Sequence, residues 1–251
     1  MATRPASRSP RILPTLCRMG VAVGFAISTW GCASAKPKLQ LVQDPSFNPA
    51  VLRQSQIAVA GVTSRLGSEI DRATVRNQFA GILAGALEFQ LSGLRVMPVD
   101  VARSRLGQVR HAQLLADLEN TGRVSVAAIA QLDSAIGAVV RYAVVARIDA
   151  ELVKREESTT TPVILPGDDY HEGDPQRSTR RSLDVSFLVY ELSDGRVVWE
   201  ELVRGSDIAT ATGSWTEKKT TYPAYPKAPK LKWAFDDACR TLAMHLAKPP
   251  K

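Results

Sequence analysis

The second half of the chain is dominated by long stretches with the composition of β-strands. Residues 138–155 and 181–192 are rich in Val, Ile, Tyr and Phe and partly alternate between apolar and polar side chains, which is typical of antiparallel strands. Ser193, Asp194 and Gly195 supply the turn of a hairpin into a third strand that continues to about Arg204. The chain must therefore build a sheet.

The first half alternates strands with helices. Residues 56–62 form a short apolar run that is typical of a buried strand, and residues 94–99 predict a second one. The helical pattern begins at Asp71 and stops at Gly93, and apolar spacing predicts further helices over 101–120, 125–132 and the last 20 residues. The predicted order is β-α-β-α-α-β-β-β-α, an α/β fold with a single sheet whose C-terminal strands are antiparallel and which is covered by helices.

The beginning of the chain has the pattern of an export signal. Residues 1–31 contain four arginines and no acid, followed by an apolar run from Met19 to Trp30. Gly31-Cys32 resembles the cleavage point of a bacterial lipoprotein signal, although Thr29 and Trp30 depart from the usual residues before it. We therefore predict a signal peptide over 1–31 and a lipid, such as palmitate, on Cys32.

Two other interpretations of the leader remain open. Residues 33–35, Ala-Ser-Ala, form a good secretory cleavage site, and cleavage there would release a soluble periplasmic or secreted protein. An arginine- and serine-rich leader without acids also occurs in organellar transit peptides. A retained membrane helix is the remaining interpretation and is not expected, because the apolar run is too short to span about 30 Å of hydrocarbon.

Charge and cysteine usage narrow the classes of function. The net charge of the chain is +7, but the leader supplies four of these charges, so the chain from Cys32 carries only +3. A surplus of this size is not the basic footprint of a nucleic-acid-binding protein. Cys239 is the one cysteine left for the folded domain, which excludes intrachain disulfides and metal sites built on cysteine pairs.

The domain organisation follows from these observations. Residues 32–55 hold Pro and Lys with little periodicity, which predicts a tether between the anchor and the domain. Residues 56–248 are about right for a single α/β domain, and residues 249–251 form a short tail. No internal repeat occurs.

The chain resembles a bacterial superfamily of exported proteins. The strand at 56–59, the strand at 94–97, the segment at 143–148 and the hairpin at 189–199, which ends in Trp199, are similar to the corresponding parts of that superfamily. It includes the TolB amino-terminal domain, the curli-secretion lipoprotein and the lipoprotein activators of penicillin-binding proteins. The resemblance implies a binding or assembly module without a catalytic centre. Pore formation is not expected. The two long loops predicted at 158–178 and 205–229 hold too much Pro and charge for the alternating strands of a membrane-lining hairpin.

Two loops carry the candidate site residues. In the loop at 205–229, aromatic rings alternate with lysines and prolines on extended backbone, which favours a contact surface for a partner; the alternative is that the rings fasten the loop to the sheet. In the loop at 158–178, close acidic residues and a histidine are weak candidates for a metal site. The candidate residues are Trp215, Tyr222, Tyr225, Lys218 and Lys219 for partner binding and Asp168, Asp169 and His171 for a metal.

Taken together, these features predict a membrane-anchored lipoprotein of the bacterial cell envelope that binds another envelope protein as an accessory or assembly factor. We expect it at the periplasmic face of the outer membrane, without a cofactor and without enzymatic activity, and an oligomer stays open. No recognised catalytic motif occurs in the sequence. The alternative function is a soluble periplasmic binding protein or a metal-dependent hydrolase that uses the acidic loop.

Overall fold

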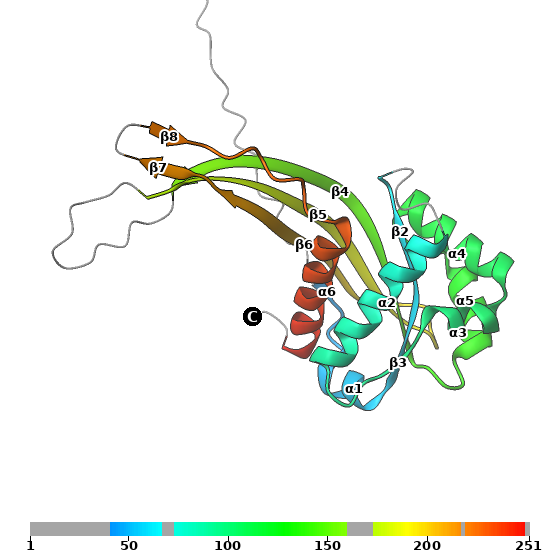
Figure 1. Cartoon of the computed structure of the whole chain (residues 1–251). Helices are drawn as coiled ribbons and strands as arrows, with labels where there is room; N and C mark the ends of the chain where they lie inside the picture. Colours follow the sequence, from blue (N-terminus) through cyan, green and yellow to red (C-terminus); the bar gives the residue numbers. More distant parts are fainter. Residues whose placement is uncertain (1–40, 67–72, 160–172, 217–218, 249–251) are drawn as a thin grey trace, which may run out of the picture. The chain divides into compact units, whose positions relative to one another are not determined.

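The computed structural model describes residues 41–66, 73–159, 173–216 and 219–248. All of the described residues belong to one compact unit, Leu39–Lys251. Its main element is a six-stranded sheet with the strand order β1-β6-β5-β4-β2-β3 (Figure 1). The strands are β1 (Leu41–Gln43), β2 (Gln56–Ser64), β3 (Arg95–Met97), β4 (Tyr142–Thr159), β5 (Pro175–Glu191) and β6 (Val197–Thr212).

The sheet is parallel on one side and antiparallel on the other. Strand β2 pairs in parallel with β3 and with β4, whereas β4, β5, β6 and β1 pair antiparallel in that order. The β5–β6 connection contains the predicted turn, with Gly195 at φ 69. This positive φ favours glycine, since it has no Cβ to clash with the backbone. The predicted α/β fold with one sheet and antiparallel C-terminal strands is confirmed.

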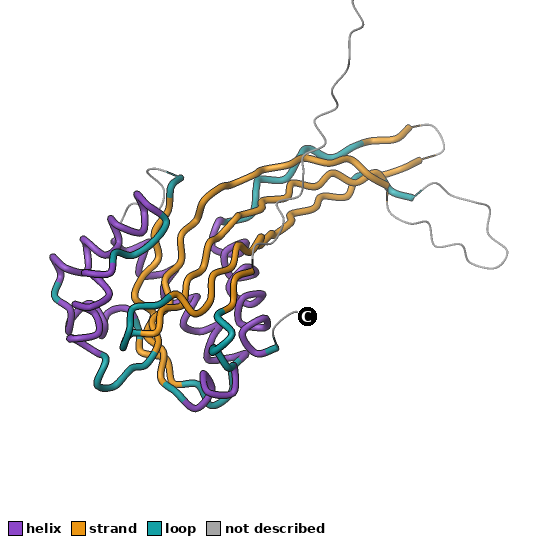
Figure 2. The backbone as a smooth tube through the Cα atoms, turned by 180° about the vertical axis from the view of Figure 1, so that it is seen from behind, coloured by secondary structure: helices purple, strands orange, loops and turns teal. Residues whose placement is uncertain are grey.

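Helices cover both faces of the sheet, as the view in Figure 2 also shows. The helices α1 (Pro49–Gln54), α2 (Ala73–Gln90) and α6 (Leu231–Ala247) share one apolar cluster with the sheet. The helices α3 (Val99–Leu106), α4 (Gln108–Thr121) and α5 (Val126–Ile136) share a second cluster on the other face. Neighbouring residues of β4 point to opposite clusters, because side chains alternate along a strand: Val144 belongs to the first and Val145 to the second.

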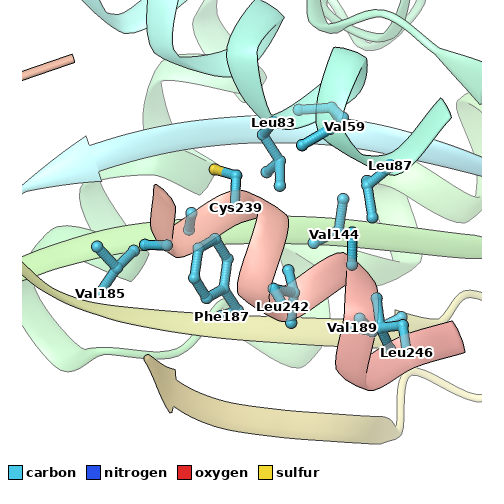
Figure 3. Close-up of a cluster of buried hydrophobic side chains, with 14 of the residues drawn as sticks. Val59, Leu83, Leu87, Val144, Val185, Phe187, Val189, Cys239, Leu242 and Leu246 are labelled. Carbon is cyan, nitrogen blue, oxygen red and sulfur yellow. The ribbon is translucent and has the colours of Figure 1, made fainter. Parts of the chain in front are cut away.

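The larger cluster lies between α6, α2 and the sheet (Figure 3). Phe187 and Val185 of β5 face Leu242 and Cys239 of α6, and all four side chains are buried. Cys239 is thus a small apolar side chain of the core, as its position in the helical pattern predicts, and its complete burial raises the pKa of the thiol.

The tether prediction is wrong for residues 41–54. Residues Leu41–Gln43 form β1, which extends the sheet beside β6, and Pro49–Gln54 form α1. Asn48 caps α1 by accepting a hydrogen bond from the nitrogen of Ala50 at 2.9 Å. Phe47 and Leu52 are buried in the first cluster, so their burial adds to the pairing of β1 in attaching this segment to the domain.

The predicted helix over 101–120 is interrupted. Gly107 has φ 91 and separates α3 from α4. Val109, at the start of α4 just after this break, is 81% exposed. Within the described residues, no helix is both long and apolar enough to cross a membrane.

Candidate functional site: a three-stranded arm

Strands β5 and β6 are much longer than the sequence predicts, and β4 ends at Thr159 instead of at Arg155. All three strands continue past the helices (Figures 1 and 2). We call this extension the arm and define it as residues 149–159 of β4, 175–184 of β5 and 204–212 of β6. The loops predicted at 158–178 and 205–229 are accordingly shorter, since β5 already begins at Pro175 and β6 runs to Thr212. A small hairpin of β7 (Ser214–Thr216) and β8 (Lys219–Thr221) follows β6.

Strand β4 is an edge strand along the arm. Its pairing with β2 ends at Ile148, opposite Ser64, and from Ala150 to Thr159 it pairs only with β5 among the described strands. A strand edge of this length presents unpaired backbone N–H and C=O groups that another strand can use. Leu152 and Val153 lie on this edge and are 57% and 44% exposed.

The two faces of the arm differ. Arg177 and Thr179 point to the face that continues the first apolar cluster, and this face carries the chain that follows β8. Thr179 donates a hydrogen bond of 2.8 Å to the carbonyl of Pro226, and Arg177 donates one of 3.0 Å to the carbonyl of Pro223. On the opposite face, Leu152 and Ile208 are exposed, and no described helix covers them.

On the covered face, Arg177 contacts one carboxylate and two aromatic rings. Its guanidinium binds Glu157 through Nε at 2.9 Å and Nη2 at 2.8 Å. The same guanidinium stacks on the ring of Tyr225, with its carbon 4.7 Å from the centroid, and on the ring of Tyr222 at 5.3 Å. Arg155 contacts Tyr225 from the other strand at 5.5 Å. The two tyrosines therefore fasten the chain after β8 to the arm.

The contact between Tyr225 and Glu157 shifts the pKa of both side chains. The hydrogen bond from Tyr225, followed by the bond from Arg177, lowers the pKa of Glu157. Partial desolvation and the bond to Glu157 raise the pKa of Tyr225. The contact is therefore a neutral phenol that donates to an ionised carboxylate at neutral pH.

The structure brings together only part of the predicted site. Tyr222 and Tyr225 lie on the arm, where they make the fastening contact that the sequence left as an alternative. Trp215 lies in β7 and Lys219 in β8, and of these two the structure describes the backbone alone. Outside the described residues lie Cys32, Lys218, Asp168, Asp169 and His171.

Sequence reasoning missed two features of the arm. These are the residues of β5 that bind the chain after β8, and the free edge of β4. Arg177 falls in the segment 158–178, which is predicted to be a loop because Pro, Asp and Thr are frequent there, and Thr179 lies between that loop and the strand predicted from Arg181. No local signal marks this part of β5 as a strand, since all of the residues 176–180 are polar. Among the described residues, no group of three or more His, Cys, Asp or Glu side chains is placed to hold a metal ion.

Comparisons with known proteins give no family. No family model matches the sequence, and no curated protein matches it. Among solved structures, the chain is similar to the PelC dodecamer from Paraburkholderia phytofirmans, with 14% identity and a TM-score of 0.35 over 84% of this chain and 98% of that one.

Two further solved structures are similar over a smaller part. The lipoprotein GNA1162 from Neisseria meningitidis has 12% identity and a TM-score of 0.29, over 65% of this chain and 88% of that one. The hypothetical protein CT253 from Chlamydia trachomatis has 16% identity and a TM-score of 0.27, over 61% and 71%. Because all three TM-scores are below 0.5, we base the functional proposal on this chain's own residues.

Proposed function

We propose that the protein is a lipoprotein of the bacterial cell envelope that is anchored through Cys32 and binds another envelope protein through its arm, as a non-catalytic accessory factor. The location rests on the leader, with its arginines, apolar run and Gly31-Cys32. The mode of action rests on one observation, the free edge of β4 with Leu152 and Val153 exposed on it.

The free edge favours a partner that contributes an extended segment. A strand that pairs with residues 150–159 would satisfy the backbone groups of β4 and would cover Leu152 or Val153 with its alternate side chains. Val153 and Leu152 point to opposite faces of the arm, so that both faces of the edge offer an apolar contact. The charged neighbours Lys154 and Glu156 form an ion pair of 2.6 Å, which leaves little net charge at the edge to repel a partner.

Ion pairs on both faces join the strands of the arm and favour its ordered form, which lowers the cost of binding. Arg204 binds Asp184 through two hydrogen bonds of 2.6 and 2.8 Å on the uncovered face, and Arg177 binds Glu157 on the covered face. Both pairs join neighbouring strands across the arm. A binding surface that is already ordered loses less conformational entropy when the partner arrives.

The first experiment tests the anchor. The intact mass of the mature protein, purified from its own membrane fraction, should equal the chain from Cys32 with added lipid. A bare chain that begins at Lys36 would overturn the anchored location and would leave a soluble envelope protein.

The second experiment tests the arm. A photo-crosslinking amino acid is placed at Leu152 or at Val109, an exposed apolar residue of α4. We expect a discrete crosslinked product from position 152 only, and the purified partner identified from it should bind the wild-type protein. Leu152→Glu should weaken that binding at least tenfold, and the matched control Val109→Glu should leave it unchanged. Equal effects of the two variants would show that the arm is not the binding surface.

A further inference from the structure

A polar hollow lies at the end of β4 opposite the arm. It has a volume of about 540 Å³ and is formed where the parallel strands begin, at Gln56 of β2, Arg95 of β3 and the residues just before β4. Gln56 pairs with Arg95, and the nitrogen of Arg141 donates to the carbonyl of Gln56 at 3.2 Å. The backbone of the sheet thus holds Arg95 and Arg141 on either side of β2.

Three arginines line this hollow, and its described lining contains no acidic residue. They are Arg53 from the last turn of α1, Arg95 and Arg141. Three positive charges around one hollow repel one another, and such an arrangement is stabilised when an anion neutralises them.

Only one of these guanidiniums is bound to a carboxylate within the described residues. Arg141 donates to Oε1 of Glu191 through Nε at 2.9 Å and Nη2 at 2.7 Å, which raises the pKa of Arg141. Glu191 is itself shared, because its second oxygen accepts a bond of 3.0 Å from Arg196. One carboxylate therefore serves two guanidiniums, and it lies outside the lining of the hollow.

The other two guanidiniums keep their charge uncompensated. Arg53 donates through Nη2 to the carbonyl of Ala247 at 2.8 Å, a neutral acceptor at the end of α6. The side chain of Arg95 is exposed, and its guanidinium makes no hydrogen bond or ion pair with a described residue. Strand pairing holds the backbone of Arg95 at the hollow, and the bond to Ala247 holds the guanidinium of Arg53.

We propose that this hollow binds a small molecule through an oxyanion, a phosphate or carboxylate group held by Arg53, Arg95 and Arg141. A guanidinium presents paired N–H groups that match two oxygens of such an anion. The volume lies within the range of small-molecule sites, and Gln54 and Gln56 add amides that can donate to or accept from the rest of the ligand. The site does not depend on the arm, since it lies at the other end of β4.

Calorimetric titration of the processed protein, purified in detergent, tests the proposal. The probes are inorganic phosphate, succinate and a short-chain phosphatidylglycerol below its critical micelle concentration, all at one ionic strength. We expect saturable binding of at least one probe. A preference for the phospholipid over phosphate would identify a lipid headgroup as the source of the anion, and the reverse would identify a free solute.

Two variants decide whether the hollow is responsible. Arg95→Gln should weaken binding about tenfold or more, as loss of a charge-assisted hydrogen bond does. The matched control is Arg110→Gln, which removes an exposed charge on α4. Both variants should keep the wild-type melting temperature, since neither side chain has a described partner. Absence of saturable binding of all three probes, or equal weakening by both variants, would overturn the proposal without affecting the proposed function of the arm.

Discussion

The phenol of Tyr225 donates a hydrogen bond of 2.9 Å to Oε1 of Glu157, a residue 68 positions earlier in the chain. Glu157 also binds Nε and Nη2 of Arg177. One carboxylate on the free edge of the arm therefore contacts side chains from two other segments. The contact therefore joins β4, β5 and the chain after β8 at a single point.

Removal of the Tyr225 hydroxyl group should increase local opening of the chain after β8. Tyr225→Phe keeps the ring on Arg177 but loses the bond to Glu157, so we expect faster amide hydrogen exchange in residues 222–230. Tyr222→Phe is the control, because the described contacts of Tyr222 involve its ring and not its hydroxyl. Hydrogen exchange measured by mass spectrometry checks both variants. Equal exchange in the wild type and Tyr225→Phe would show that ring stacking alone holds the segment.

Gly205 of β6 lies where the backbone of α6 comes very close to the sheet. A Cβ at Gly205 would collide with the carbonyl oxygen of Ala234 and lie 2.5 Å from the backbone nitrogen of Ala238, and backbone atoms of α6 cannot rotate away. Gly205→Ala should therefore lower the free energy of unfolding by about 1–3 kcal/mol. Urea unfolding followed by circular dichroism measures this change.

Gly85 of α2 is the matched control, because a Cβ there would meet no atom within 4 Å. Glycine in the interior of a helix costs backbone entropy, and Gly85→Ala should therefore raise the free energy of unfolding by about 0.5–1 kcal/mol. If both alanines act in the same direction, the close approach of α6 to Gly205 is not the cause.

The parts of the fold that could be predicted are those whose signal is local. Ser125 accepts a hydrogen bond of 3.3 Å from the nitrogen of Ala128 and caps α5, and Gly195 forms the turn before β6. Caps and turns depend on residues within three or four positions, so the sequence shows them directly. The apolar face of α6 was predictable for the same reason.

The parts that could not be predicted depend on residues far apart in the sequence. Strand β1 is held by pairing with β6, about 160 positions away, and α1 by the burial of Phe47 and Leu52. The arm is held by pairs such as Glu151 with Arg181, so that a polar segment becomes a strand once its neighbours are present. Tertiary pairing overrides weak strand propensity in such segments.

A central aromatic side chain of α6 should be essential for stability. Phe235 is fully buried and packs against the rings of Phe79 and Phe187, with centroid distances of 4.8 and 6.4 Å. Phe235→Ala should cost about 3–5 kcal/mol of unfolding free energy. Trp233→Ala, two residues earlier and 52% exposed, should cost less than about 1 kcal/mol. Similar costs for the two variants in urea unfolding would contradict the burial of Phe235.

The buried imidazole of His111 should make the fold sensitive to mild acid. His111 lies on α4 with Nε2 at 2.8 Å from the carbonyl of Ala60, so the neutral ring donates this bond. Burial is the main cause that lowers its pKa below 6.5, the bond to Ala60 acts in the opposite direction, and the charges of Arg103 and Arg76 lower it further. The unfolded chain therefore takes up the proton at a higher pH than the folded protein does.

The sign of the pH dependence follows from this difference. The stability contributed by neutral His111 is complete above the unfolded pKa near 6.5 and is lost as the pH falls below it, because protonation then favours the unfolded chain. His111→Gln replaces the imidazole by an amide that does not titrate and can donate to the same carbonyl. Urea unfolding at pH 7.5 and 5.5 should show a smaller loss of stability in this variant than in the wild type. Arg110→Gln, the neighbouring residue of α4, should keep the wild-type loss, and an equal loss in all three proteins would assign the acid sensitivity to groups other than His111.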